Sequence, residues 1–98
     1  ALHCEGDILV PLAHACLDQM FMAQSAFTLV FAILSERTTA RYGQRGFRYI
    51  YMDLGHAGQN IYLQAESMGL GTVGIGAFHD DDVARILHLP PNERPAYL

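Results

Sequence analysis

The sequence predicts an α+β domain in which helices pack on a small sheet, and two stretches carry that prediction. Residues 44–68 form the longest run with apolar side chains at helical intervals. Residues 26–34 are apolar on both faces, broken only by Thr28, which is typical of a strand covered on both sides. A chain of 98 residues is short enough for one small domain, so we expect residues 1–98 to form a single unit.

The composition predicts an interface with another protein segment and argues against nucleic acid and membrane surfaces as partners. Hydrophobic residues make up 51% of the chain and charged residues only 16%, whereas about 25% charged is usual. A small core cannot hide so much apolar surface, so we expect a large interface with a partner subunit or with further chain.

The net charge of -4 argues against binding to nucleic acid or to a membrane surface. Cys4 and Cys16 suggest no disulfide framework, which favours the cytoplasm.

Two helices are expected in the first half. Residues 7–22 predict an amphipathic helix, and residues 35–43 predict a short helix that Ser35 caps and Gly43 ends. Four of the six arginines fall between Arg37 and Arg48. They are either an anion site, because arginine binds such groups bidentately, or a solvated helix face.

The helix expected over residues 44–68 carries an apolar stripe opposite a polar one. Small, uncharged residues cover much of the remaining circumference, so we expect it to be buried nearly all round, with close backbone approach at Gly55 and Gly58. The apolar stripe consists of Ile50, Leu54, Ala57, Ile61, Ala65 and Met68, and the polar stripe of Asp53, His56, Asn60 and Ser67.

Residues 69–76, "GLGTVGIG", contain a literal G-x-G-x-x-G. A dinucleotide fingerprint needs a strand, then glycines, then a helix, whereas here a helix comes first and its negative end would repel a pyrophosphate. We therefore expect Gly69 to end the helix and residues 72–78 to form a strand. Gly74 and Gly76 then leave one face bare, either for a planar ligand or for a bulge or tight helix crossing.

No metal site is expected. The "HDDD" run at 79–82 resembles a hard-cation cluster, but Asp80 as the cap of a short helix with two acids in its first turn explains it equally well. His14 and Cys16, two apart on a helix, point to different faces.

Several motifs stand in order along the chain: Arg41-Tyr42-Gly43, "DLGHAGQN" at 53–60, "GLG" at 69–71, Gly76-Ala77-Phe78 and "LHLP" at 87–90. Together they resemble the C-terminal half of nitroreductase-like flavoproteins, particularly the SagB-type dehydrogenases that oxidise thiazolines and oxazolines in peptide-toxin biosynthesis. The resemblance implies a partial nitroreductase-like domain whose long buried helix lies at a dimer interface.

The same resemblance implies an FMN-dependent oxidoreductase that forms a homodimer or higher oligomer. Hydride transfer would occur at the flavin N5, with NAD(P)H as donor and a small molecule as substrate, and no catalytic residue is implied. The flavin ring would meet Gly74, Ile75, Gly76 and Ala77. Tyr42, Phe47 and His56 would be either substrate-pocket residues or core packing.

One departure from the family pattern motivates a second hypothesis. The arginine-serine-arginine motif that grips the FMN phosphate in the family is absent from this sequence. The alternative is therefore a non-catalytic oligomerisation or flavin-sequestering module that retains half of the fold.

Overall fold

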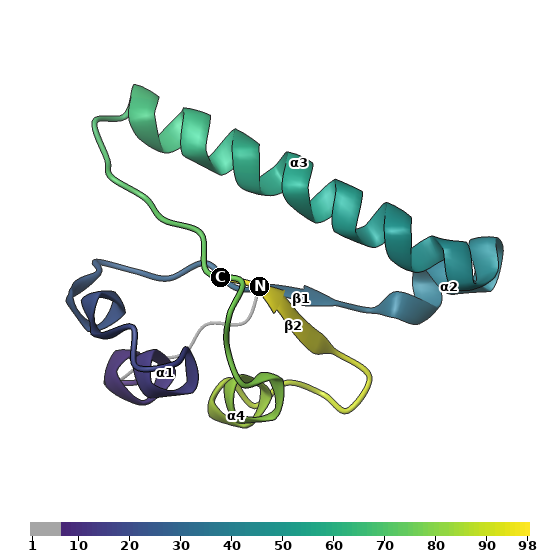
Figure 1. Cartoon of the computed structure of the whole chain (residues 1–98), viewed down its shortest axis with the longest axis horizontal. Helices are drawn as coiled ribbons and strands as arrows, with labels where there is room; N and C mark the ends of the chain where they lie inside the picture. The colour runs from purple at the N-terminus through teal and green to yellow at the C-terminus, as the bar shows by residue number, and fades with distance from the viewer. Residues whose placement is uncertain (1–6) are drawn as a thin grey trace.

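The computed structural model describes residues 7–98, which form helical layers on either side of a small sheet (Figure 1). One layer is the long helix α3, and the other contains α1 and α4. In chain order the elements are α1 (Leu9–Ala15), the 3₁₀ helix η1 (Met20–Gln24), β1 (Phe31–Ile33), α2 (Ser35–Tyr42), the 3₁₀ helix η2 (Gly43–Arg45), α3 (Gly46–Ser67), α4 (Asp80–Ile86) and β2 (Arg94–Tyr97).

The sheet joins segments from opposite parts of the chain. β1 and β2 are antiparallel, with Phe31 opposite Tyr97 and Ile33 opposite Arg94. The register shifts between Phe31 and Ala32. The rings of Phe31 and Tyr97 stack with centroids 6.4 Å apart, so the pairing brings two aromatic side chains together.

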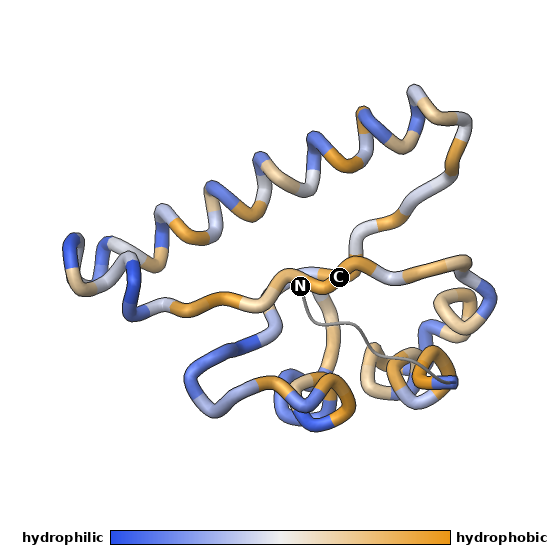
Figure 2. The backbone as a smooth tube through the Cα atoms, turned by 180° about the vertical axis from the view of Figure 1, so that it is seen from behind, coloured by the Kyte–Doolittle hydropathy of each residue, from blue (hydrophilic) through white to orange (hydrophobic). Residues whose placement is uncertain are grey.

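The hydrophobic core lies on the α1 and α4 side of the sheet, where orange positions alternate with blue ones along both helices in Figure 2. Its most completely buried large side chains are Leu12, Cys16 and Val83. The extended segment after α3 also enters this core through Ile75. The core therefore fixes the middle of the segment that contains the predicted ring contacts.

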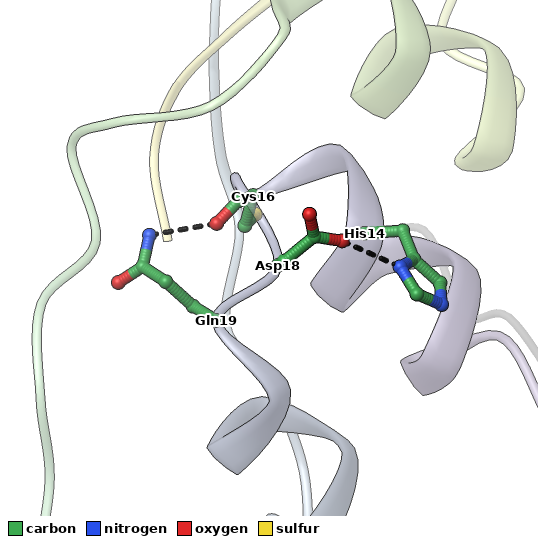
Figure 3. Close-up of polar contacts among 4 residues, drawn as sticks. All are labelled: His14, Cys16, Asp18 and Gln19. Atoms are coloured by element: carbon green, nitrogen blue, oxygen red, sulfur yellow. Dashed lines mark hydrogen bonds and ion pairs between the residues drawn. The ribbon is translucent and has the colours of Figure 1, made fainter.

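The helix expected over residues 7–22 is divided into α1 and η1. Leu17 and Asp18 adopt φ of 57° and 58°, a left-handed conformation that ends a helix. His14 Nδ1 lies 2.7 Å from Asp18 Oδ1, and the Gln19 amide donates to the Cys16 carbonyl at 2.8 Å (Figure 3). These side chains stabilise the turn, which periodicity alone could not predict.

The two expected strands are largely wrong. Residues 26–34 yield only the short β1, and Phe27 and Leu29 are 64% and 51% exposed because no described element covers them. Residues 72–78 form no strand; they are irregular, with a bend at Phe78. Within them, Ile75 alone exchanges both backbone hydrogen bonds with Leu98, at 2.7 and 3.1 Å.

The helix expected over residues 35–43 is confirmed as α2, and Gly43 follows it with a φ of 56°. Ser35 is not the cap, however, because the N-cap is Leu34 and no side chain bonds to the helix start.

The end of α3 is also confirmed. Gly69 has a φ of 71°, and the Leu70 N–H donates to the Ala65 carbonyl, as in a Schellman motif.

The stripes of α3 are confirmed except at Met68, which is exposed. Hydrophobic and hydrophilic positions alternate along the helix in Figure 2. The expectation of burial nearly all round is wrong for this chain, because Gly46, Ile50 and Gly58 are the buried residues of α3. One face of the long helix therefore packs on the rest of the chain and the others are exposed.

Acidic residues begin α4, as expected, but His79 and not Asp80 occupies the N-cap. Asp81 pairs with Arg94 of β2 at 3.0 Å, and Asp82 pairs with Arg85 at 2.5 Å. Both pairs are largely exposed, so each contributes little to stability.

Within residues 7–98, no helix is long and apolar enough to cross a membrane.

Candidate functional site

The site is built where Tyr97 of β2 lies between two glycines. A Cβ on Gly58 of α3 would lie 2.7 Å from Cε1 of Tyr97, and a Cβ on Gly74 would lie 2.0 Å from its hydroxyl oxygen. Neither glycine could carry a side chain without displacing the ring. The bare backbone at Gly74 thus accommodates a planar group, but that group belongs to the chain itself.

The amides of Gly74 and Ile75 have partners within the chain. The Gly74 N–H donates to the Tyr62 hydroxyl at 2.5 Å, and the Ile75 N–H donates to the Leu98 carbonyl at 2.7 Å. One bond reaches α3 and the other reaches the residue after β2. The segment is therefore held from both layers.

The amides of Gly76 and Ala77 are different, because neither donates a hydrogen bond to another group in the described part of the chain. Both residues are exposed, and a Cβ on Gly76 would meet nothing within 4 Å. The Ala77 carbonyl accepts a bond from the Gln19 side chain at 3.2 Å. Each N–H is consequently free to donate to a ligand, and at Gly76 it lies beside open space where a side chain would stand.

A cavity of about 420 Å³ lies between the second half of α3, residues 21–31 and residues 70–75. Gly74 and Ile75 contribute to its wall, whereas Gly76 and Ala77 do not. Its lining has no charged side chain, and its polar side chains are Ser25, Thr28, Tyr62, Gln64, Thr72 and Tyr97. The cavity therefore suits an uncharged, largely apolar group and provides no cation for a phosphate.

The three predicted pocket residues do not line this cavity. Tyr42 ends α2, where its ring meets Tyr49 edge to face at 5.0 Å and lies beneath Arg41. Phe47 is half-buried in the first turn of α3, and His56 is exposed on that helix. The structure does not bring these residues together with residues 74–77 in one cavity.

No three His, Cys, Asp or Glu side chains approach one another as metal ligands do, as far as residues 7–98 show. His14 is exposed whereas Cys16 is buried, so the two do point to different faces. Burial raises the pKa of the Cys16 thiol, because desolvation disfavours the thiolate. Cys4 lies outside the described residues.

Comparison with known proteins decides the family. The sequence model of the nitroreductase family matches residues 3–98. The chain belongs to the nitroreductase family.

Two curated relatives agree with this membership. The chain is 53% identical over 78 residues to the "Putative nitroreductase MJ1384" of Methanocaldococcus jannaschii, which covers 80% of this chain and 39% of that protein. It is 31% identical over 72 residues to the microcin B17-processing protein McbC of Escherichia coli, which covers 74% and 26%. The chain thus spans well under half of the length of either relative. No solved structure gives a significant match.

The partial nitroreductase-like α+β fold expected from the sequence is confirmed. Sequence reasoning missed Tyr62 and Tyr97 as parts of the site in this member of the nitroreductase family. One signal was available, because Gly58 interrupts the α3 face from which Tyr62 also projects, and a glycine there indicates close approach by another group. Nothing in the sequence pattern identified Tyr97 as that group.

Proposed function

We propose that this chain is the flavin-ring-binding part of an FMN-dependent oxidoreductase. The observation that carries the proposal is the pair of exposed, unpartnered amides at Gly76 and Ala77 beside open space. Family membership supports an oxidoreductase role.

The residues fit the ring of the cofactor. Gly76 has no side chain to obstruct a planar group, and its unpartnered N–H can stabilise negative charge on a reduced ring. Bound FMN would supply hydride acceptance and donation at N5, with NAD(P)H as the donor. Gly74 and Ile75 remain ring contacts in the same proposal, although their N–H groups already donate within the chain.

The proposed assembly is a homodimer. Large hydrophobic side chains remain exposed along α3 and beyond it, and a second copy that covers them would complete a core. Met52 and Leu63 lie about three turns apart on α3, which places them on one face. They are 51% and 61% exposed.

The substrate is proposed to be a small organic acceptor of uncharged character. The charge-free lining of the cavity beside Gly74 supports this class. Similarity to a protein named as a nitroreductase favours nitro compounds, and similarity to a microcin-processing protein favours the SagB-type branch. Tyr42, Phe47 and His56 remain proposed pocket residues, which would have to meet the substrate across an interface.

The test is FMN titration of the purified protein, followed by flavin fluorescence. We expect saturable quenching in wild type and loss of most affinity in Gly76→Val, because the new side chain occupies the space left for the ring. Gly55→Val is the matched control, since its Cβ also meets nothing within 4 Å and it does not line the cavity. A folded wild type that quenches no flavin, or equal binding by Gly76→Val, would overturn the proposal.

The alternative is a non-catalytic module that oligomerises or sequesters flavin. The absence of a cation from the cavity lining favours it, because the lining offers no partner for the FMN phosphate. Oxidation of NAD(P)H with a quinone or nitroaromatic acceptor separates the two functions. Turnover above that of free FMN excludes the module, whereas flavin binding without turnover supports it.

A further inference from the structure

Tyr62 is the side chain through which α3 hydrogen-bonds to the segment that follows it. Its hydroxyl accepts the Gly74 N–H at 2.5 Å, and this bond links residues twelve positions apart. Tyr62 lies one turn beyond Gly58, so both residues face the same side of α3. This side is the one against which Tyr97 packs.

The direction of the neighbouring amides follows from the pairing of Ile75. A residue that exchanges both bonds with its antiparallel partner directs its N–H and C=O toward that partner, and the residues on either side direct theirs away. Ile75 pairs with Leu98 in this way. The N–H groups of Gly74 and Gly76 therefore point away from Leu98, and the Tyr62 hydroxyl receives the first of them.

We propose that Tyr62 is a positioning residue for flavin binding, because its bond to the Gly74 amide acts together with the Ile75–Leu98 pair to fix the direction of the Gly76 amide. This inference rests on the proposed function, in which Gly76 meets the ring. No described group bonds to the Gly76 amide itself, so its orientation depends on its neighbours. Tyr62 acts through Gly74 and makes no contact with the ring in this proposal.

Tyr97 provides a matched control. Its hydroxyl also lies beside Gly74 and also lines the cavity, but no described group forms a hydrogen bond with it. Tyr97→Phe therefore removes a phenol oxygen from the same place without removing an anchor of the segment. Tyr62→Phe removes only the hydroxyl group and keeps the aromatic ring. Because Tyr62 lies at the surface of α3, this change should leave the fold intact.

The first measurement is amide hydrogen exchange in the flavin-free protein. In wild type we expect the Gly74 amide to exchange more slowly than the unpartnered Gly76 amide. Tyr62→Phe should accelerate exchange at Gly74 about tenfold, because one hydrogen bond is lost, and Tyr97→Phe should leave it unchanged.

The second measurement compares the affinities of each variant for oxidised and reduced FMN. A misdirected Gly76 amide stabilises the charge of the reduced ring less well. We expect Tyr62→Phe to weaken binding of oxidised FMN about threefold and of reduced FMN about tenfold, from the worth of one hydrogen bond. A merely structural defect would weaken both forms equally.

Each remaining outcome counts against the assignment. An unprotected Gly74 amide in wild type overturns it, whatever the variants do. Faster exchange in Tyr62→Phe with unchanged preference for reduced over oxidised FMN also overturns it. Wild type that binds no flavin overturns the proposed function itself and the assignment with it, while the exchange data report on the hydrogen bond separately.

Discussion

The ring of Tyr97 packs so closely on Gly58 that a Cβ on the glycine would lie 2.7 Å from Cε1 of the tyrosine. This contact joins β2 to the middle of α3. It also gives a structural reason for a glycine at the centre of a long helix, where glycine costs about 0.5–1 kcal/mol relative to alanine.

Gly58→Ala is expected to lower the free energy of unfolding by about 1–3 kcal/mol, because the new methyl group forces Tyr97 to move. Gly55→Ala is the matched control in the same helix, since its Cβ would meet nothing within 4 Å. That change should stabilise the protein by about 0.5–1 kcal/mol. Urea unfolding of both variants measures the difference, and equal effects would contradict the close contact.

Gly69→Ala should destabilise the protein by about 1 kcal/mol, because an alanine is strained at a φ of 71°. Gly71→Ala, two residues on and outside the left-handed region, should be neutral or slightly stabilising. Thermal unfolding followed by circular dichroism compares them. The Schellman assignment fails if Gly69→Ala melts at the temperature of wild type.

The Cys16 thiol should react with iodoacetamide roughly tenfold more slowly in the native protein than in urea, because it is buried and its thiolate is disfavoured. Mass spectrometry of the peptide that contains Cys16 measures the rate. Similar rates in both conditions would show that this part of the core opens readily.

The same thiol gives stability a pH dependence of known sign. Its folded pKa is raised, so its contribution is fully present below the ordinary thiol pKa and is lost as pH rises through the folded value. Unfolding in urea at neutral and alkaline pH should therefore show a decline that Cys16→Ala lacks. An identical decline in both proteins assigns it to other groups.

Leu63→Glu should convert the proposed homodimer to monomers, because it places a charge on an exposed apolar face of α3. Asn92→Glu adds the same charge to the exposed turn between α4 and β2, away from α3, and should leave the assembly intact. Light scattering coupled to size-exclusion chromatography gives the masses. Monomeric wild type, or a dimeric Leu63→Glu protein, counts against an interface on this face.

Local signals predicted the helices better than the strands. Gly43 and Gly69 end their helices through backbone conformations that few other residues adopt, so these boundaries could be read directly. The turn at Leu17 and Asp18 could not, because ordinary residues adopt the left-handed conformation there, beside hydrogen bonds that the side chains of Asp18 and Gln19 form. Only β1 forms within the strand expected over residues 26–34. Apolar residues indicate that a segment is buried, but they do not identify the neighbouring segment that covers it or pairs with it.

The candidate site could be predicted only in part, for a related reason. Glycines at 74 and 76 indicated that something approaches the backbone, but both a ligand and a side chain satisfy that requirement. The structure separates the two positions, with Tyr97 against Gly74 and open space at Gly76. Whether a ligand or a side chain lies against a glycine is decided by contacts between residues far apart in the sequence, and no local pattern predicts those contacts.

The pairing of β1 with β2 also has a consequence for how this chain folds. Phe31 and Tyr97 come from opposite parts of the sequence, and bringing them together requires a large loop to close. Contacts between α2 and α3 are local and can form during synthesis, whereas Tyr97 is made more than twenty residues after Gly74 and can pack between Gly58 and Gly74 only then. The helices beside the site can therefore form before the residue that sets the spacing between its two glycines.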